Sequence, residues 1–242
     1  MKPIRWALPG IIACLLVTAG PTSAARQNLR LKPFTAEYDL SRGMLVFAKV
    51  RVSLTLLPPD RYRYEARTEP TGLYNLIRND EITEISKGIV KGGRITPLVY
   101  HYRHKKTDSD HQVDLEFNWP ALHVINRTPD SRWIMKIDSG TQDKFGHQLA
   151  LMLALADATR DIRLKVADGG KTKNYRFEYQ GKELIHTPAG SYQAMKMVRT
   201  KDDRPSQASL WLAPEINYLP VRVERKEKDG PFVMKLNSFR WD

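Results

Sequence analysis

Histidine and carboxylate side chains gather between positions 101 and 111, where they could bind a metal ion. His101 and His104 precede Asp108, Asp110 and His111, and imidazole and carboxylate groups are typical ligands of zinc and related metals. On a strand, however, His101 and His104 would point to opposite faces, because they lie three positions apart. A metal ion could bind between His104 and His111 across a hairpin, but side chains that decorate an exposed turn are the simpler interpretation. We therefore predict no metal site in this segment.

Motifs for nucleophilic or phosphate chemistry are absent from the sequence. It contains no Gly-x-Ser-x-Gly and no His-Glu-x-x-His, the patterns of serine hydrolases and zinc proteases. Gly170-Lys171-Thr172 matches only the end of a phosphate loop, because Lys165 stands where the first glycine is required. The acidic pairs Asp80-Glu81 and Asp202-Asp203 lie in turn-like segments without an aromatic platform for a sugar. We predict no catalytic residue, and an envelope hydrolase ranks last among the functions considered.

The first 24 residues are predicted to be a cleaved secretory signal peptide. Lys2 and Arg5 precede the apolar stretch Ile11–Val17, and the small residues at positions 22 and 24 fit cleavage after Ala24. Cleavage after Ala25 fits nearly as well. The apolar stretch is too short for a membrane-spanning helix, which needs about 20 residues. We therefore expect a single β domain over residues 25–242 that is exported to a bacterial periplasm.

Cys14 is the one cysteine of the chain, and it lies inside the predicted signal peptide. Cleavage before Cys14 would give a lipoprotein, but it would leave Leu15–Val17 on the mature protein, so we prefer cleavage after Ala24. We expect no lipid anchor at Cys14. Without this residue the mature chain has no thiol for a disulfide, a nucleophile or a metal thiolate.

The chain is strongly basic, with 39 Lys and Arg against 27 Asp and Glu. Basic and aromatic residues alternate in Arg61–Arg67 and Tyr100–Lys106, a pattern that could bind nucleic acid by stacking and phosphate contacts. An exported protein meets anionic lipid headgroups instead. We predict no nucleic-acid partner, and we expect an anionic membrane surface or an envelope protein as the partner. A solvated basic face is the alternative.

Alternation of apolar and polar residues is the main pattern from Phe34 onward. In Arg61–Thr68, for example, Tyr62, Tyr64 and Ala66 share one face of a strand and charged residues share the other. The sequence predicts a mainly β fold, a large antiparallel curved sheet or barrel of more than a dozen short strands. The expected strands are 34–40, 44–56, 61–68, 81–90, 95–105, 111–118, 122–126, 133–137, 162–166, 173–179, 182–186, 192–200, 208–213, 221–226 and 232–239.

One buried apolar helix is expected over Asp143–Asp157. Residues 149–156 read Leu-Ala-Leu-Met-Leu-Ala-Leu-Ala, a run of strong helix formers, and Thr141 and Asp143 are candidate N-caps. Because the run is apolar nearly all round, we expect it to be packed on several sides. A second, short helix is expected over Gly72–Arg78.

This central helix is the candidate ligand site. A curved sheet around one helix leaves a cavity where the helix does not fill it, and the mouths of barrels are common ligand sites. A lipid or another amphiphile would suit the apolar surface. The candidate ligand-binding residues, on the helix and on the wall that Trp and Tyr would brace, are Leu149, Met152, Leu153, Leu155, Trp211 and Tyr218. The alternative is a structural or envelope-assembly factor whose helix fills the core; no cofactor is expected in either case.

The C-terminal third resembles the DUF3108 family of exported bacterial proteins. The resemblance is carried by Thr187–Tyr192, Met195–Arg199, Trp211–Glu215 and Leu219–Val223, and it extends in element order over Phe34–Phe239. It implies a periplasmic, largely antiparallel β protein of no settled function. A looser similarity to the half-barrels of lipoprotein carriers, a curved sheet around a helical plug, concerns architecture only.

Overall fold

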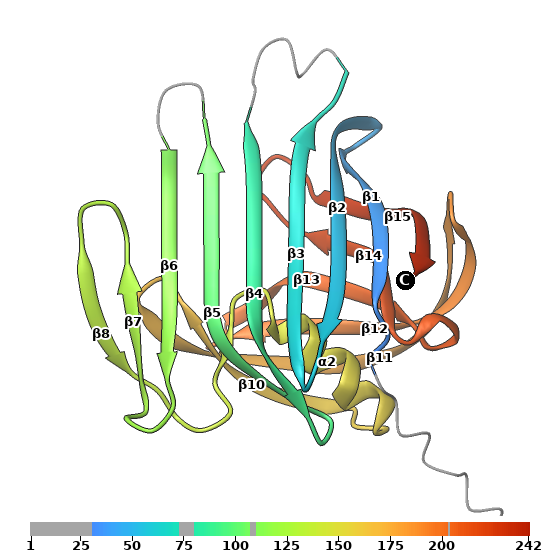
Figure 1. Ribbon diagram of the computed structural model, residues 1–242. Coiled ribbons are helices and arrows are strands. Elements are labelled where there is room, and N and C mark those ends of the chain that lie inside the picture. The colour runs from blue at the N-terminus through green and yellow to red at the C-terminus, as the bar shows by residue number, and fades with distance from the viewer. Residues whose placement is uncertain (1–30, 73–79, 107–109, 203) are drawn as a thin grey trace, which may run out of the picture.

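The computed structural model describes residues 31–72, 80–106, 110–202 and 204–242, which form one curved sheet around a helix (Figure 1). The strands are β1 (Phe34–Arg42), β2 (Leu45–Leu57), β3 (Arg61–Pro70), β4 (Glu81–Lys91), β5 (Arg94–Lys105), β6 (Asp110–Asn118), β7 (His123–Arg127), β8 (Arg132–Lys136), β9 (Gln142–Asp143), β10 (Asp161–Asp168), β11 (Lys171–Thr187), β12 (Gly190–Lys201), β13 (Arg204–Ala213), β14 (Leu219–Arg225) and β15 (Phe232–Trp241). The α-helix is α2 (His147–Ala156), and η1 (Pro214–Ile216) is a short 3₁₀ turn.

The sheet joins strands that follow one another along the chain, with one exception. Its order is β8-β7-β6-β5-β4-β3-β2-β1-β15-β14-β13-β12-β11-β10-β9, so β1 pairs with β15. Phe34 lies opposite Trp241, and Arg42 lies opposite Phe232. The first and last strands therefore meet in the middle of the sheet, and strands from the middle of the chain form its two edges. The predicted mainly β, curved and largely antiparallel sheet is confirmed, and the sheet is not closed.

Strand β3 shows how the sequence pattern builds this sheet. Tyr62, Tyr64 and Ala66 are buried on the inner face, whereas Arg61 and Arg67 are exposed on the outer face. Successive side chains of a strand point to opposite faces, so one face can pack on a core while the other meets water. The predicted faces of this strand are confirmed.

One expectation for local structure differs from the structure, and another concerns residues outside the described ranges. The expected strands 173–179 and 182–186 form a single strand, β11, with a register shift between Tyr179 and Lys182. Gly181 lies at this irregularity with a φ of 109°, a conformation that is available to glycine, so the strand bends without ending. Residues 73–78 of the expected short helix lie outside the described residues.

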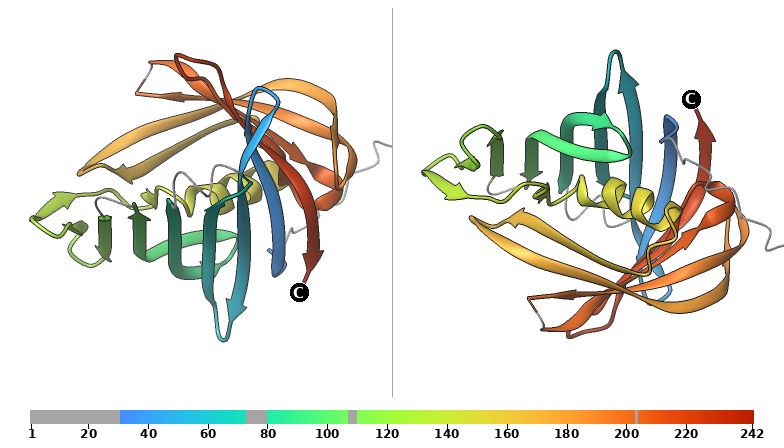
Figure 2. Two further views of the ribbon diagram at one scale, coloured as in Figure 1. Left: turned by 90° about the horizontal axis from the view of Figure 1, so that it is seen from above. Right: turned by 90° about the horizontal axis from the view of Figure 1, so that it is seen from below.

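Helix α2 lies between two arms of the sheet (Figure 2). Strands β1–β8 form one arm, and β10–β14 curve around the other side of the helix. The core lies where the inner faces of both arms meet the helix, and the stacked rings of Tyr64 and Phe145 mark its centre, with centroids 4.1 Å apart. In the described part of the chain, no helix is long and apolar enough to cross a membrane.

Candidate functional site

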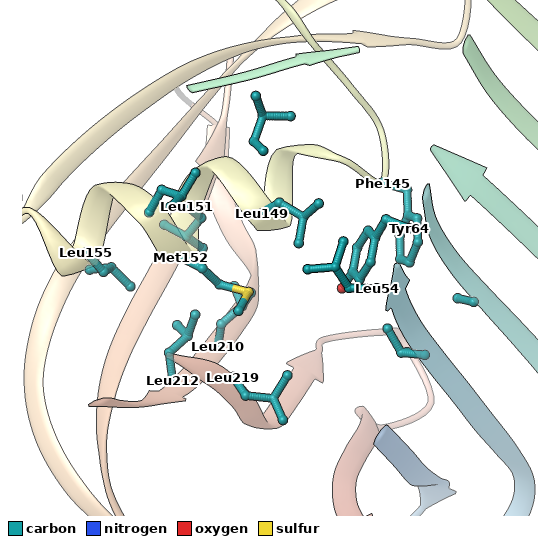
Figure 3. Packing of buried hydrophobic residues seen from close by; sticks show 14 of the residues in the cluster. Leu54, Tyr64, Phe145, Leu149, Leu151, Met152, Leu155, Leu210, Leu212 and Leu219 are labelled. Carbon is teal, nitrogen blue, oxygen red and sulfur yellow. The ribbon is translucent and has the colours of Figure 1, made fainter. Parts of the chain in front are cut away.

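The predicted apolar helix is buried on several sides. Leu149, Leu151 and Leu155 are completely buried, and Met152 is 2% exposed. Figure 3 shows Leu149 directed at Leu54 of β2 and Met152 directed at Leu210 of β13, so both arms contribute to the packing. A helix that is apolar nearly all round requires this environment.

A buried hydrogen-bonded group fixes the N-terminal end of the helix. Oδ1 of Asp143 accepts the backbone N–H groups of Phe145 at 2.8 Å and Gly146 at 2.6 Å. Its Oδ2 accepts the hydroxyl of Ser86 at 2.5 Å, and Ser86 also lies 2.9 Å from the hydroxyl of Tyr62. Asp143 therefore holds the turn that leads into the helix and links it to β3 and β4. The predicted N-cap is wrong, because Gly146 is the N-cap residue and no side chain forms a capping hydrogen bond there. Burial raises the pKa of Asp143 from 3.8 to about 6, although these hydrogen bonds favour its charged form.

Gly146 is required by the close approach of this group. A Cβ atom at Gly146 would lie 2.7 Å from Oδ2 of Asp143 and 2.7 Å from Oγ of Ser86. Both distances are shorter than van der Waals contact, so a larger residue would push the side chains of Asp143 and Ser86 away from the helix. The absence of a side chain at this position permits the hydrogen bonds.

His147, the first residue of the helix, is buried between aromatic rings. Its ring is perpendicular to Tyr175 at 5.3 Å and stacked with Phe177 at 6.0 Å. Burial, together with the positive charge of Arg199, lowers the pKa of His147 to about 3. The imidazole is therefore neutral at physiological pH and acts as a packed aromatic group.

Beside this end of the helix, paired charges lie on the arm formed by β1–β8. The hydroxyl of Tyr100 donates a hydrogen bond of 2.6 Å to Glu84. Burial raises the pKa of Glu84, whereas this hydrogen bond and the charge of Lys144 oppose the rise. Lys144 also lies over the ring of Tyr102, with Nζ 5.5 Å from its centroid. Glu84, Tyr100 and Lys144 are thus already engaged within the protein.

The opposite arm carries a matching group around Asp168. Lys173 and Lys201 bind its carboxylate at 2.6 Å and 3.2 Å, and the hydroxyl of Tyr175 donates to it at 3.3 Å. Burial opposes ionisation of Asp168, but hydrogen bonds from the two lysines and the charge of Lys144 lower its pKa to about 2. The positive charge of Lys144 therefore favours the ionised form of a carboxyl group on each arm.

An open cavity of about 880 Å³ lies at the other end of the helix. It is bordered by the turn between β2 and β3, by the turn between β4 and β5, and by the last residues of the helix. Small-molecule sites have volumes of roughly 300–1,000 Å³, so the cavity has the size of a ligand site. Its principal apolar lining residues are Leu31, Leu56, Leu57, Pro58, Val90 and Leu153.

Charged side chains border the same cavity. Lys91 lies 3.8 Å from the carboxylate of Asp60, and both side chains are largely exposed. Such an exposed pair contributes little, about 0–1 kcal/mol. Arg61, which also lines the cavity, forms no ion pair with a carboxylate among the residues that the structure describes. The cavity therefore combines an apolar wall with two cations, Arg61 and Lys91, and with two carboxylates, Asp60 and Asp157.

Most of the sequence matches a protein family. The match is to the family described as "Protein of unknown function (DUF3108)", and it covers residues 37–237, most of the chain. The chain belongs to the DUF3108 family. The predicted membership is thereby confirmed, and no curated protein matches this DUF3108 chain.

A solved structure shares the fold of the DUF3108 chain. It is a beta-barrel-like protein of the domain of unknown function DUF1849 from Brucella abortus, with a TM-score of 0.62 and 12% sequence identity. The similarity covers 88% of this chain and 99% of the other. At this identity the comparison concerns the fold alone, and it agrees with the predicted half-barrel architecture.

The structure separates the four candidate ligand-binding residues on the helix of the DUF3108 chain. Leu153 lines the cavity and is 5% exposed. Leu149, Met152 and Leu155 lie in the packed core, and they are not among the residues that border the cavity. A ligand could therefore contact Leu153 without any change in packing, whereas contact with the other three would require the core to open.

The two candidates outside the helix lie away from the cavity. Trp211 donates a hydrogen bond of 2.7 Å to Glu183, and its ring is covered by Lys196 and Arg222, whose charged groups lie 5.1 Å and 4.8 Å from its centroid. These partners belong to neighbouring strands, as expected for a residue that braces the sheet. Tyr218 has a φ of 58° and lies in the tight connection that follows η1. Ligand contact by either residue stays a prediction.

The histidines considered above as metal ligands have other partners. Nδ1 of His101 lies 2.6 Å from the carboxylate of Asp114. His104 and His111 do lie opposite each other on β5 and β6, but nowhere in the described ranges do three metal-binding side chains gather. Asp108 lies outside the described residues. The absence of a metal site stays a prediction.

Sequence reasoning missed most of the cavity and most of the buried polar group. The segments Pro58-Pro59-Asp60 and Lys91-Gly92-Gly93 carry clear turn signals, but no local pattern shows that the two turns border one cavity. Ser86 carries no signal, because a serine in an alternating strand is ordinary. Neither candidate N-cap caps the helix: Asp143 accepts N–H groups of the turn before it, and Thr141 donates its hydroxyl to the carbonyl of Asp138.

Proposed function

We propose that this protein binds an anionic amphiphile, such as a single-chain lipid, in the cavity at the C-terminal end of helix α2, and that it catalyses no reaction. The observation that carries the proposal is the lining of the cavity. Leu56, Leu57 and Leu153 provide an apolar wall, and Arg61 and Lys91 lie on the same cavity. An acyl chain would pack on the leucines while its charged headgroup meets the cations.

The apolar wall is large enough to contribute measurable affinity. Each methylene group that leaves water contributes about 0.8 kcal/mol, so six such groups would contribute about 5 kcal/mol. This free energy corresponds to a Kd between about 0.1 and 1 mM. Contacts of a headgroup with Arg61 and Lys91 would tighten binding further, because charge-assisted hydrogen bonds are stronger than neutral ones.

The proposed place of action is the periplasm. The support is the predicted signal peptide, with Lys2 and Arg5 before the apolar stretch Ile11–Val17. A protein in that compartment meets amphiphiles from two membranes, and a soluble domain with an open apolar cavity could bind them. The proposed ligand class therefore agrees with the proposed compartment.

A structural or envelope-assembly role without a small ligand is the second candidate. The observation in its favour is the filled core, in which Leu149, Leu151 and Leu155 are completely buried between the arms. In that case the cavity would hold only solvent, and the curved sheet would serve as a rigid body for a partner protein. A direct binding experiment separates the two candidates.

The experiment measures binding of a dansyl-labelled fatty acid by fluorescence titration. Leu57 lines the cavity and is 50% exposed, whereas Leu184 on β11 is 52% exposed and does not line it. Leu57→Ser should weaken binding about tenfold, because it removes apolar contact from the ligand. Leu184→Ser is the matched control, and it should bind as the unmodified protein does.

A second pair of variants tests the headgroup. Lys91→Glu reverses a charge at the cavity, and Lys87→Glu reverses an exposed charge elsewhere on the same strand. The first should weaken binding of the anionic probe severalfold, and the second should leave it unchanged. The proposal is wrong if the protein binds no acyl probe and native mass spectrometry of protein from the periplasm shows no lipid. If Leu57→Ser and Leu184→Ser bind the dansyl-labelled fatty acid equally well, the probe binds outside this cavity.

A further inference from the structure

Three consecutive apolar side chains are exposed at the turn between β1 and β2. Met44 is fully exposed, Leu45 is 64% exposed and Val46 is 44% exposed. Isolated apolar residues are normal on a protein surface, whereas a contiguous exposed group marks a site of interaction. We call residues 44–46 the hairpin tip.

The hairpin tip lies past the pairing of β2 with β3. Strand β2 pairs with β3 from Ala48 onward, which lies opposite Pro70, and the carbonyl of Phe47 accepts the backbone N–H of Thr71 at 2.8 Å. Residues 44–46 lie beyond this contact. On the other side, the pairing of β1 with β15 ends at Arg42 and Phe232. Figure 1 shows this turn at one end of β2. The three apolar residues therefore lie at the end of the hairpin.

The base of the hairpin tip is held in a defined position. The rings of Phe47 and Phe232 meet edge to face, with centroids 5.7 Å apart. The guanidinium groups of Arg42 and Arg225 lie over the ring of Phe232, at 5.1 Å and 5.7 Å from its centroid. The tip thus stands on an ordered aromatic and cationic base, so little conformational freedom is lost when it binds a surface.

The side chains around this base are mostly basic. The connection between β14 and β15 adjoins the tip, because Asp229 lies 3.3 Å from the guanidinium of Arg42. Four basic residues outnumber two acidic ones in this group, which consists of Arg42, Arg225, Lys226, Lys228, Glu227 and Asp229.

We propose that the hairpin tip inserts into the boundary between headgroups and acyl chains of an anionic lipid bilayer, with the surrounding basic residues on the headgroups. An apolar point next to basic side chains is the combination by which interfacial elements bind membranes. A second copy of the chain fits the tip less well. A stable protein interface buries about 800 Å² per partner, and three side chains do not provide that area.

The membrane contact and the ligand cavity lie at opposite ends of the same strand. Strand β2 begins at Leu45 in the tip and ends at Leu57 in the cavity. At about 3.3 Å per residue, its two ends are about 40 Å apart. The inference does not depend on ligand binding in the cavity, so either proposal can fail while the other holds.

Co-sedimentation with vesicles tests the membrane contact. The protein used is the chain from Ala25 onward, because the apolar stretch Ile11–Val17 could itself bind lipid and the described fold begins at residue 31. The vesicles contain equal parts of phosphatidylcholine and phosphatidylglycerol. The variant Met44→Ser/Leu45→Ser should bind at least about tenfold more weakly than the unmodified chain, because two apolar side chains no longer enter the bilayer.

The matched control removes two apolar side chains that are also largely exposed but lie elsewhere on the surface. Ile134 is 60% exposed and Leu184 is 52% exposed, so Ile134→Ser/Leu184→Ser should bind vesicles as the unmodified chain does. Raising the salt concentration from low to physiological should weaken binding in both proteins, because salt screens the attraction to the headgroups.

A fluorescent label reports insertion directly. The chain from Ala25 contains no cysteine, so Met44→Cys can be labelled with a nitrobenzoxadiazole group at one position. Its emission should increase and shift to the blue when vesicles are added, whereas the same label at Leu184→Cys should not change. This readout does not rely on removing a contact, so a folding defect cannot imitate it.

Three results would overturn the proposal. The first is that the unmodified chain does not bind the vesicles, and the second is that Met44→Ser/Leu45→Ser binds them equally well with no response from the label at position 44. The third is a concentration-dependent dimer, seen by analytical ultracentrifugation without lipid, that Met44→Ser/Leu45→Ser abolishes. In that case the tip would bind a second copy of the chain.

Discussion

The two ends of helix α2 meet different surroundings. At the N-terminal end, Asp143, Ser86 and Tyr62 form a buried, connected hydrogen-bonded group. At the C-terminal end, Leu153 and Asp157 border an open cavity. The difference shows how a helix can keep its place while one end faces empty space. Polar contacts fix the position and direction of the helix at its start, so the last turn need not be fully packed.

The largest expected effect comes from making the same change at both ends. Leu149 is completely buried near the fixed end, and Leu153 lines the cavity. Leu149→Ala should lower the free energy of unfolding by about 3–4 kcal/mol, because it leaves a void among packed side chains. Leu153→Ala should lower it by about 1–2 kcal/mol, because that side chain already borders open space. Urea unfolding of both variants measures the difference, and equal losses would contradict the contrast between the ends.

Next in size is an effect of pH at the fixed end. His147 has a pKa of about 3 in the folded protein, below its ordinary value of 6.5, so the unfolded chain takes up a proton first as pH falls. The free energy of unfolding should therefore drop below pH 6.5, by about 2 kcal/mol at pH 5. His147→Gln removes this contribution. Urea unfolding at pH 7 and pH 5 should show a smaller loss in the variant than in the unmodified protein.

Asp143 should act in the opposite direction over the same range. Its pKa is raised from 3.8 to about 6, so the folded protein takes up this proton first as pH falls. The carboxyl group should therefore add about 1.5 kcal/mol of stability between pH 6 and pH 4.5. Asp143→Asn should make the protein lose more stability on acidification than the unmodified chain does, whereas His147→Gln should make it lose less. Shifts of the same sign in both variants would contradict the assigned pKa values.

The smallest effect concerns the hydroxyl of Ser86, which joins Asp143 to the sheet. Ser86 bridges Asp143 and Tyr62, and Ser86→Ala should lower the free energy of unfolding by about 1–2 kcal/mol, because two buried groups lose a partner. Ser53 lies partly exposed on β2, and Ser53→Ala should change stability by less than about 0.5 kcal/mol. Thermal unfolding of the pair checks this, and similar shifts in Tm would mean that the bridge does not anchor the helix.

Local patterns made much of the fold predictable. The alternation in Arg61–Thr68 fixed which side chains of β3 are buried, and the apolar run at 149–156 placed the helix within a few residues of its observed bounds. Asp143 was recognisable as a polar residue near the start of the helix, although its carboxylate binds the preceding turn and does not cap the helix. Each of these features depends on residues that lie close together in the sequence, so the sequence alone reveals it.

The pairing of distant segments could not be predicted. Nothing in Phe34–Arg42 indicates that its partner is Phe232–Trp241, because strand pairing depends on the whole sheet rather than on local pattern. The cavity could not be predicted for the same reason: two hairpin turns and Leu153 border it, and they are far apart in the sequence. The family resemblance supplied the class of fold but no site, because no function is settled for the family.

The pairing of β1 with β15 has a consequence for the connectivity of the molecule. The backbone N–H of Asp242 donates to the carbonyl of Pro33 at 3.1 Å. The start of β1 therefore lies next to the end of β15. The free edges of the sheet, β8 and β9, are instead joined by the short segment 137–141. A circular permutant that links Asp242 to Pro33 and opens the chain within this segment would keep every strand pair. In that order, all fifteen strands would follow one another along the chain as they do across the sheet.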